Sequence, residues 1–150
     1  MFYKDGLCFA CQRCLYCCSS EPGYVFLSQS DISNASKALS ISESEFVRIY
    51  CRYVDYGYYQ MISLKEKSNY DCIFLTKEGC SIYQGRPVQC RTYPFWKGIM
   101  EDRKSWDEEA KSCPGINKGK KVDKAYIEKC LNQNEDNVPV MILKGQKNPY

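Results

Sequence analysis

The sequence contains no histidine among its 150 residues. Histidine is the usual general base near neutral pH and the commonest metal ligand, so its absence excludes mixed cysteine–histidine zinc sites. Any zinc in this chain would be held mainly by sulfur, and sites of that kind are usually closed and structural. The composition therefore argues against hydrolysis of the metalloprotease kind.

Long apolar runs are also missing from the sequence. No stretch approaches the 18 or so apolar residues that a membrane-spanning helix needs. The first residues, Met1 to Gly6, lack the basic region, apolar stretch and small-residue cleavage site of a secretory signal. We therefore expect a cytoplasmic protein with no membrane partner. In that reducing compartment, dense cysteines indicate metal ligands or redox chemistry before disulfides.

Cysteine is the residue that the sequence has in excess, with 11 in all. An odd number of thiols cannot all pair within one chain. The formal charge of +3, from 21 basic and 18 acidic side chains, counts every thiol as neutral. Eight ligating thiolates around two divalent centres would bring the charge to about −1, because ligating thiols are deprotonated. The charge balance thus gives no reason to expect a nucleic-acid partner.

The strongest motif lies near the amino terminus, where Cys11, Cys14, Cys17 and Cys18 follow the spacing C-x2-C-x2-C-C. Two residues between cysteines let one loop turn two sulfur atoms toward the same ion. Thiolates are soft donors that suit zinc and iron–sulfur centres. This segment predicts a metal or iron–sulfur site.

A second subset of the same cysteines matches a different spacing. Cys8, Cys11, Cys14 and Cys18 follow the C-x2-C-x2-C-x3-C run of bacterial ferredoxins. Ser19 replaces the proline that normally follows, and the later cysteines do not repeat the run as a two-cluster ferredoxin requires. The spacing alone therefore leaves the ligand status of Cys8 open.

The later cysteines divide into two groups. Cys51 and Cys130 fall on the apolar faces of predicted helices, which favours a place in the core. The others lie in turns or at element boundaries, where ligands can converge, although a small buried hydrophobic role is equally compatible with them. This second group comprises Cys72, Cys80, Cys90 and Cys113.

The hydrophobic pattern predicts a small, loop-rich α+β protein, a single domain of short strands and several short helices organised around cysteine-ligated metal. We expect a metal-binding domain over residues 1–134 and a polar tail over residues 135–150. The expected strands are 24–27, 60–65 and 72–76, the expected helices are 31–39, 42–53 and 123–132, and a solvated turn is expected over 115–121.

The first cluster and four later motifs occur in a characteristic order. They are Phe9-x-Cys11-x2-Cys14-x2-Cys17-Cys18, Cys72-Ile-Phe-Leu, Gly79-Cys80-Ser-Ile-Tyr83, Arg86-Pro87-x2-Cys90-Arg91-x-Tyr93-Pro94-Phe95 and Cys113-Pro114-Gly115. In combination they resemble the cysteine-cluster family of zinc- or iron-chelating domains, which includes flagellin lysine N-methylase. The resemblance spans residues 9–120.

The resemblance implies a ligand set and a choice of metal. Zinc, iron or a 4Fe–4S cluster would be the bound species, and the thiolates would fill two four-thiolate sites or one cluster with a second metal. Three cysteines, Cys8, Cys51 and Cys130, lie outside the family pattern. The implied ligands are Cys11, Cys14, Cys17, Cys18, Cys72, Cys80, Cys90 and Cys113.

Three functions are compatible with these features. The first is a metal-binding protein with a structural or accessory role. The second, implied by the methylase members of the family, is an iron–sulfur-dependent lysine N-methyltransferase with S-adenosylmethionine as donor and a protein as substrate. The sequence offers no glycine-rich strand-to-helix turn of the kind that commonly holds a nucleotide-like cofactor, and no catalytic residue is evident. The third is a small electron carrier.

Overall fold

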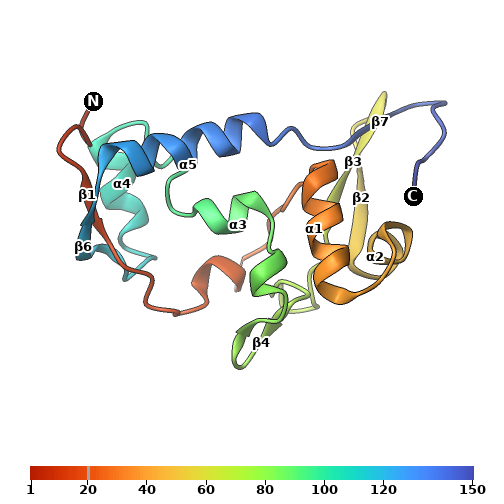
Figure 1. Cartoon of the computed structure of the whole chain (residues 1–150), viewed down its shortest axis with the longest axis horizontal. Coiled ribbons are helices and arrows are strands. Elements are labelled where there is room, and N and C mark those ends of the chain that lie inside the picture. Colours follow the sequence, from red (N-terminus) through yellow and green to blue (C-terminus); the bar gives the residue numbers. More distant parts are fainter. Residues whose placement is uncertain (20) are drawn as a thin grey trace. The chain divides into compact units, whose positions relative to one another are not determined.

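The computed structural model describes residues 1–19 and 21–150 (Figure 1). Ser20 lies outside the described residues. The mixture of helices and strands confirms the predicted α+β class. The chain divides into two compact units, a first unit of Met1–Cys17 with Gln89–Asp136 and a second unit of Cys18–Val88 with Asn137–Tyr150. Each unit has its own apolar core.

The first unit contains a two-stranded antiparallel ribbon, in which β1 and β6 lie side by side (Figure 1). Leu7 is opposite Val122, Cys8 is opposite Lys121, and the register shifts after Cys8. Two short elements, η1 (Tyr16–Cys18) and α3 (Val88–Thr92), contain residues of both units. The other elements of this unit are β1 (Leu7–Phe9), α4 (Arg103–Glu109), β6 (Ile116–Val122) and α5 (Lys124–Asp136).

The solvated turn expected over 115–121 is wrong, because these residues form most of β6. Two glycines explain the difference. A Cβ on Gly115 would lie 2.4 Å from the Ala10 carbonyl oxygen, and one on Gly119 would lie 2.4 Å from the Ala10 Cβ. Gly119 also has φ of 73°, a conformation that other residues adopt only with strain. The two glycines thus let this segment lie close to the backbone at Ala10. The lysine-rich sequence gives no sign of this contact.

Aromatic packing forms the core of the first unit. The fully buried Trp106 stacks on Phe95 with ring centroids 5.9 Å apart, and its indole N–H donates a 2.9 Å hydrogen bond to Asn117 Oδ1. Satisfying the one polar atom of a buried indole removes the cost of desolvating it. Cys113 and Cys130 belong to the same core cluster.

The second unit packs two helices with a three-stranded antiparallel sheet of strand order β2-β3-β7 (Figure 1). Ser28 caps α1 and Ser42 caps α2, since each hydroxyl accepts a 3.1 Å hydrogen bond from the backbone N–H three residues later. Both predicted helices are confirmed. The elements are α1 (Gln29–Leu39), α2 (Glu43–Tyr50), β2 (Cys51–Asp55), β3 (Tyr59–Leu64), β4 (Leu75–Thr76), β5 (Gly79–Cys80), η2 (Tyr83–Gly85) and β7 (Met141–Leu143).

Two boundaries in the second unit differ from prediction. The helix expected to continue through residue 53 ends at Tyr50, and Cys51 turns into the extended conformation that begins β2. Five consecutive residues of β2 then pair with β3, so sheet pairing overrides the helical pattern. The strand expected over 24–27 is reduced to one bridge between Phe26 and Ser63.

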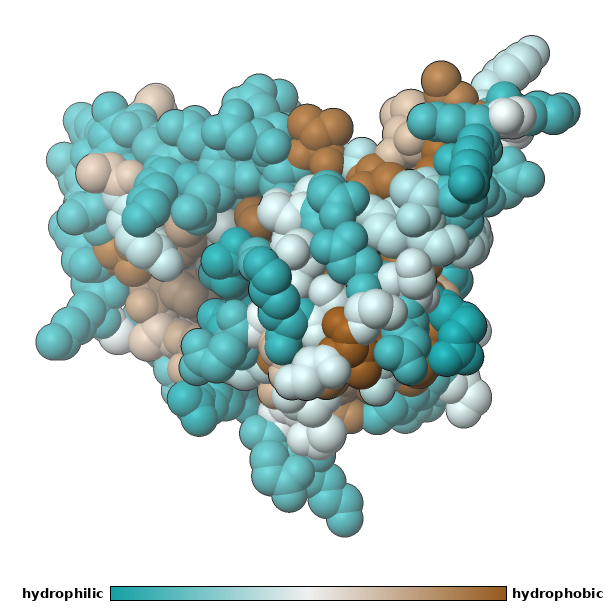
Figure 2. All heavy atoms as spheres, turned by 45° about the vertical axis from the view of Figure 1, so that its right-hand side comes forward, coloured by the Kyte–Doolittle hydropathy of each residue, from teal (hydrophilic) through white to brown (hydrophobic). Residues whose placement is uncertain are grey.

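The segment after α5 also takes part in the second unit. β7 pairs with β3, and the Val140 N–H donates a 2.8 Å hydrogen bond to the Leu27 carbonyl. Figure 2 shows a largely hydrophilic face on which hydrophobic atoms occupy small, separate areas. Among residues 1–19 and 21–150, no helix is both long and apolar enough to span a membrane.

Candidate metal centre

The first cysteine cluster follows β1, with Cys11 and Cys14 in an irregular segment and Cys17 and Cys18 in η1. Cys11, Cys14 and Cys17 are exposed. Two residues beside Cys14 are left-handed, Arg13 with φ of 52° and Leu15 with φ of 66°. A left-handed conformation costs a residue with a side chain roughly 1–2 kcal/mol, and such strain is concentrated at ligand clamps and other functional sites.

A backbone hydrogen bond reaches sulfur within this segment. The N–H of Arg13 donates to Cys11 Sγ across 3.4 Å. The donor belongs to the second residue after the cysteine, inside the C-x2-C loop. A thiolate is stabilised by such a donor, and hydrogen bonds to ligand sulfurs tune metal–thiolate centres. The loop therefore holds a hydrogen-bond donor against the Cys11 sulfur.

Cys18 and Cys72, which are distant in sequence, meet within the second unit. The backbone N–H of Cys72 donates a 2.8 Å hydrogen bond to the Cys18 carbonyl oxygen. Cys72 also pairs with Glu66 in an isolated antiparallel bridge. Its carbonyl accepts a 2.9 Å hydrogen bond from Leu75, the residue of β4 that lies opposite Cys80 of β5. The fold therefore brings the chain segments of Cys18, Cys72 and Cys80 together.

The pKa of the Cys72 thiol depends on burial and on neighbouring groups. Burial raises its pKa, a backbone hydrogen bond from Phe74 opposes that effect, and the Cys80 thiol raises the pKa further. Phe74 is the second residue after Cys72, so the relation repeats that of Arg13 to Cys11. Without metal, Cys72 favours the neutral thiol, whereas a coordinating cation deprotonates a thiol outright.

The remaining two family-pattern cysteines, Cys90 and Cys113, belong to the first unit. Cys90 is half-buried on α3, whereas Cys113 is buried just after α4. The Tyr93 hydroxyl donates a 2.6 Å hydrogen bond to Glu109 Oε1. Burial raises the pKa of Tyr93, and its hydrogen bonds to Glu109 and Cys113 act in the same direction. A neutral tyrosine hydroxyl therefore lies beside the Cys113 sulfur.

The family-pattern cysteines are divided between the two units. No disulfide ties up any of the eleven cysteines. Across residues 1–19 and 21–150, no three cysteine, aspartate or glutamate side chains form a group that could hold a metal. The first unit carries Cys11, Cys14, Cys17, Cys90 and Cys113, and the second carries Cys18, Cys72 and Cys80. The donor chemistry fits zinc or iron.

The cysteines outside the family pattern have other surroundings. Cys51 and Cys130 are 5% and 3% exposed, which confirms that both belong to the core. Burial raises the pKa of Cys130 and raises that of Cys51 to about 12. Cys8 is half-buried in β1, opposite Lys121.

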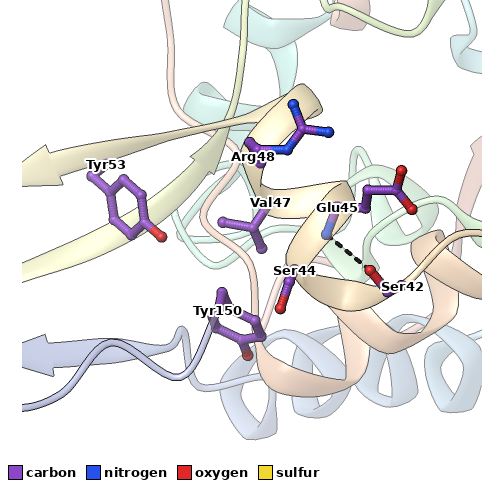
Figure 3. A pocket seen from close by; sticks show the side chains of 7 residues that line it. All are labelled: Ser42, Ser44, Glu45, Val47, Arg48, Tyr53 and Tyr150. Carbon is purple, nitrogen blue, oxygen red and sulfur yellow. Dashed lines mark hydrogen bonds between the residues drawn. The ribbon is translucent and has the colours of Figure 1, made fainter.

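A hollow of about 470 Å³ lies in the second unit beside α2 (Figure 3). The Ser42 hydroxyl, drawn with its hydrogen bond from Glu45, serves as the cap of α2. None of the lining residues is a cysteine, so the hollow is separate from the candidate ligands. Its lining comprises Ser42, Ser44, Glu45, Val47, Arg48, Tyr53 and Tyr150.

Two residues beside the candidate ligands are missed by sequence reasoning. Arg52 and Glu66 contact the segment that follows Cys18, through hydrogen bonds to the backbone of Gly23. No motif marks them, because both contacts join residues distant in sequence. Left-handed Arg13 and Leu15 are missed as well, since neither is a residue type that favours this conformation.

These features are typical of a class, the cysteine-rich metal-chelating domains. The family model CxxCxxCC, described as "Putative zinc- or iron-chelating domain", matches residues 10–114. The chain belongs to this family, which confirms the resemblance found in the sequence. The match begins after Cys8, ends before Cys130 and contains all eight family-pattern cysteines. No solved structure matches the chain.

Proposed function

We propose that this protein binds zinc or iron in the cytoplasm through cysteine thiolates and that the bound metal has a structural or accessory role. The observation that carries the proposal is the hydrogen bond from the Arg13 N–H to Cys11 Sγ. The proposed ligands are Cys11, Cys14, Cys17, Cys18, Cys72, Cys80, Cys90 and Cys113.

The backbone of the first cluster supports this function. Left-handed Arg13 and Leu15 are unfavourable in the chain on its own, and exposed Cys11, Cys14 and Cys17 gain little from packing. Metal coordination would explain this arrangement, because the free energy of the metal–thiolate bonds would offset the conformational cost of the two left-handed residues. A chance run of free thiols has no need of a strained loop.

The surroundings of Cys72 support the same function. Its sulfur accepts a backbone hydrogen bond from Phe74 and lies close enough to Cys80 for that neighbour to raise the pKa of Cys72. Two neighbouring thiolates repel each other in the absence of a cation, whereas a divalent ion between them removes that repulsion. Metal binding would therefore release protons and stabilise the second unit.

Substitutions within the first cluster test the proposal. We expect Cys11→Ser and Cys17→Ser to lower the metal content of anaerobically purified protein, measured by elemental analysis. Cys8→Ser, in the same segment but outside the family pattern, is the matched control and should keep the metal. Loss of metal in Cys8→Ser with retention in Cys17→Ser would instead favour the ferredoxin-like subset.

Spectroscopy of the same samples distinguishes the metals. Colourless protein with stoichiometric zinc favours the structural role. Sulfur-to-iron charge-transfer bands in anaerobic protein favour iron or an iron–sulfur cluster. Folded wild-type protein that binds neither metal would refute the proposal.

A further inference from the structure

A polar network in the second unit holds both backbone groups of Gly23. The Gly23 N–H donates a 2.7 Å hydrogen bond to Glu66 Oε1. Arg52 Nη2 donates a 3.0 Å hydrogen bond to the Gly23 carbonyl oxygen. One residue of the segment that follows Cys18 is thus fixed by two side chains of opposite charge.

The two side chains also interact with each other. Arg52 Nη2 lies 3.7 Å from Glu66 Oε2, and the side chains are 38% and 16% exposed. The Arg52 guanidinium carbon lies 4.9 Å from the centre of the Tyr24 ring. An isolated surface ion pair contributes little to stability, but this pair is partly buried, stacked and bonded to backbone. These contacts fix Glu66 in a single place.

The backbone of Glu66 leads directly to a proposed ligand. Glu66 and Cys72 form an antiparallel bridge, and the Ile73 N–H donates a 3.1 Å hydrogen bond to the Lys65 carbonyl beside it. The Cys72 N–H in turn donates to the Cys18 carbonyl across 2.8 Å. Contacts therefore run from Gly23 through Glu66 and Cys72 back to Cys18.

We infer that Glu66, supported by Arg52, is a positioning residue that holds Cys18 and Cys72 side by side for metal binding. The inference rests on the proposed function. A negative Glu66 carboxylate near the Cys72 thiolate is electrostatically unfavourable. The charge of Glu66 therefore does not explain why a carboxylate lies here. The hydrogen bond to Gly23 explains why a carboxylate stands here, and the ion pair with Arg52 offsets its charge.

Titration of purified full-length variants with Zn²⁺ and Co²⁺ tests the inference. Glu66→Ala removes the acceptor for Gly23 and the partner of Arg52, so we expect its metal affinity to fall about 10- to 100-fold, the range for residues that orient ligands. Glu66→Gln keeps an acceptor oxygen but not the charge, and its affinity should lie between those of wild type and Glu66→Ala. Arg52→Met, which keeps a long apolar stem, should also weaken binding.

The Co²⁺ spectrum separates positioning from general stability. The intensity of the thiolate-to-cobalt charge-transfer band reports how many thiolates bind, and it should fall in Glu66→Ala while far-ultraviolet circular dichroism stays unchanged. Glu128→Ala is the control, since it breaks another ion pair, with Lys124 at 3.4 Å, in the first unit. It should leave affinity and spectrum as in wild type.

The outcomes distinguish the inference from the proposed function. Wild-type affinity and band intensity in all three variants, with metal still bound through cysteine, would overturn the inference alone. Should Glu66→Ala fail to fold, Glu66→Gln and Arg52→Met decide, and wild-type behaviour in both would overturn it. Wild-type protein that binds no Zn²⁺ or Co²⁺ would overturn both.

Discussion

Cys72 donates its backbone N–H to the carbonyl oxygen of Cys18 across 2.8 Å, which joins the end of the first cysteine cluster to the segment before β4. Spacing along the chain does not predict this contact. It shows that the second unit brings together cysteines that the family pattern only places in order.

The left-handed turn at Arg13 leads to the first prediction. Arg13→Gly should raise the unfolding free energy of metal-free protein by about 0.5–1 kcal/mol, because glycine adopts positive φ without the Cβ penalty while losing more entropy on folding. It should also keep the metal. Arg13→Pro removes the N–H donor to Cys11 and cannot adopt the φ of 52°, so its metal affinity should fall. Denaturant unfolding and zinc titration check the two effects. Equal zinc affinity in both variants would contradict a role for this donor.

The buried thiol of Cys51 makes stability depend on alkaline pH. Burial raises its pKa from the ordinary 9.0 to about 12. The folded protein therefore keeps a proton that the unfolded chain loses, and this contribution to stability is complete below pH 9 and lost as the pH rises toward 12. The free energy of unfolding should fall by at most about 1.4 kcal/mol per pH unit in this window on account of this group.

The Cys51→Ala variant isolates that contribution. The difference in unfolding free energy between wild type and variant should shrink between pH 9 and pH 12, as measured by urea unfolding at several pH values. Cys8→Ala serves as a control for loss of a thiol outside the family pattern. A difference that stays constant with pH would show that Cys51 ionises alike in both states.

Asp31 stabilises the second unit through three donors. It is 2% exposed and accepts hydrogen bonds from the backbone N–H groups of Ser28 and Val88 and from Asn137 Nδ2, at 3.1, 3.0 and 2.8 Å. Asp31→Ala leaves these donors unpaired and should cost about 3 kcal/mol or more of unfolding free energy. Asp31→Asn, which keeps one acceptor oxygen, should cost less. Similar, small losses in both variants would contradict this role.

The β1–β6 ribbon depends on Gly119. An added Cβ would lie 2.4 Å from the Ala10 Cβ at a residue with φ of 73°, so Gly119→Ala should lower stability by about 1–3 kcal/mol. Gly98→Ala is the matched control, since nothing lies within 4 Å of its added Cβ. Thermal unfolding that ranks the two alanine variants equally would refute the close approach.

Local signals made part of the fold predictable. Ser28 and Ser42 mark the starts of α1 and α2 because each cap acts within four residues. β6 was not predicted, since its partner β1 lies in a distant part of the chain. β2 was missed for another reason, because its residues continue the apolar pattern of α2 although they pair with the neighbouring strand β3. Sequence patterns therefore describe helices better than sheets here.

The candidate site was also only partly predictable from the sequence. Cysteine spacing and the family motifs indicate the proposed ligands, because a metal needs several donors at close range. Glu66 and Arg52 remain invisible in the sequence, since their function depends on Gly23 and on a bridge to Cys72. Residues that position ligands become evident only in three dimensions.

The metal content of anaerobically purified wild-type protein is the most direct measurement. Elemental analysis, paired with a count of reactive thiols before and after chelation, reports both the metal and the number of cysteines that it protects. We predict stoichiometric zinc or iron and protection of the family-pattern cysteines. Well-folded protein that contains neither metal and has every accessible thiol reactive before chelation would contradict the account.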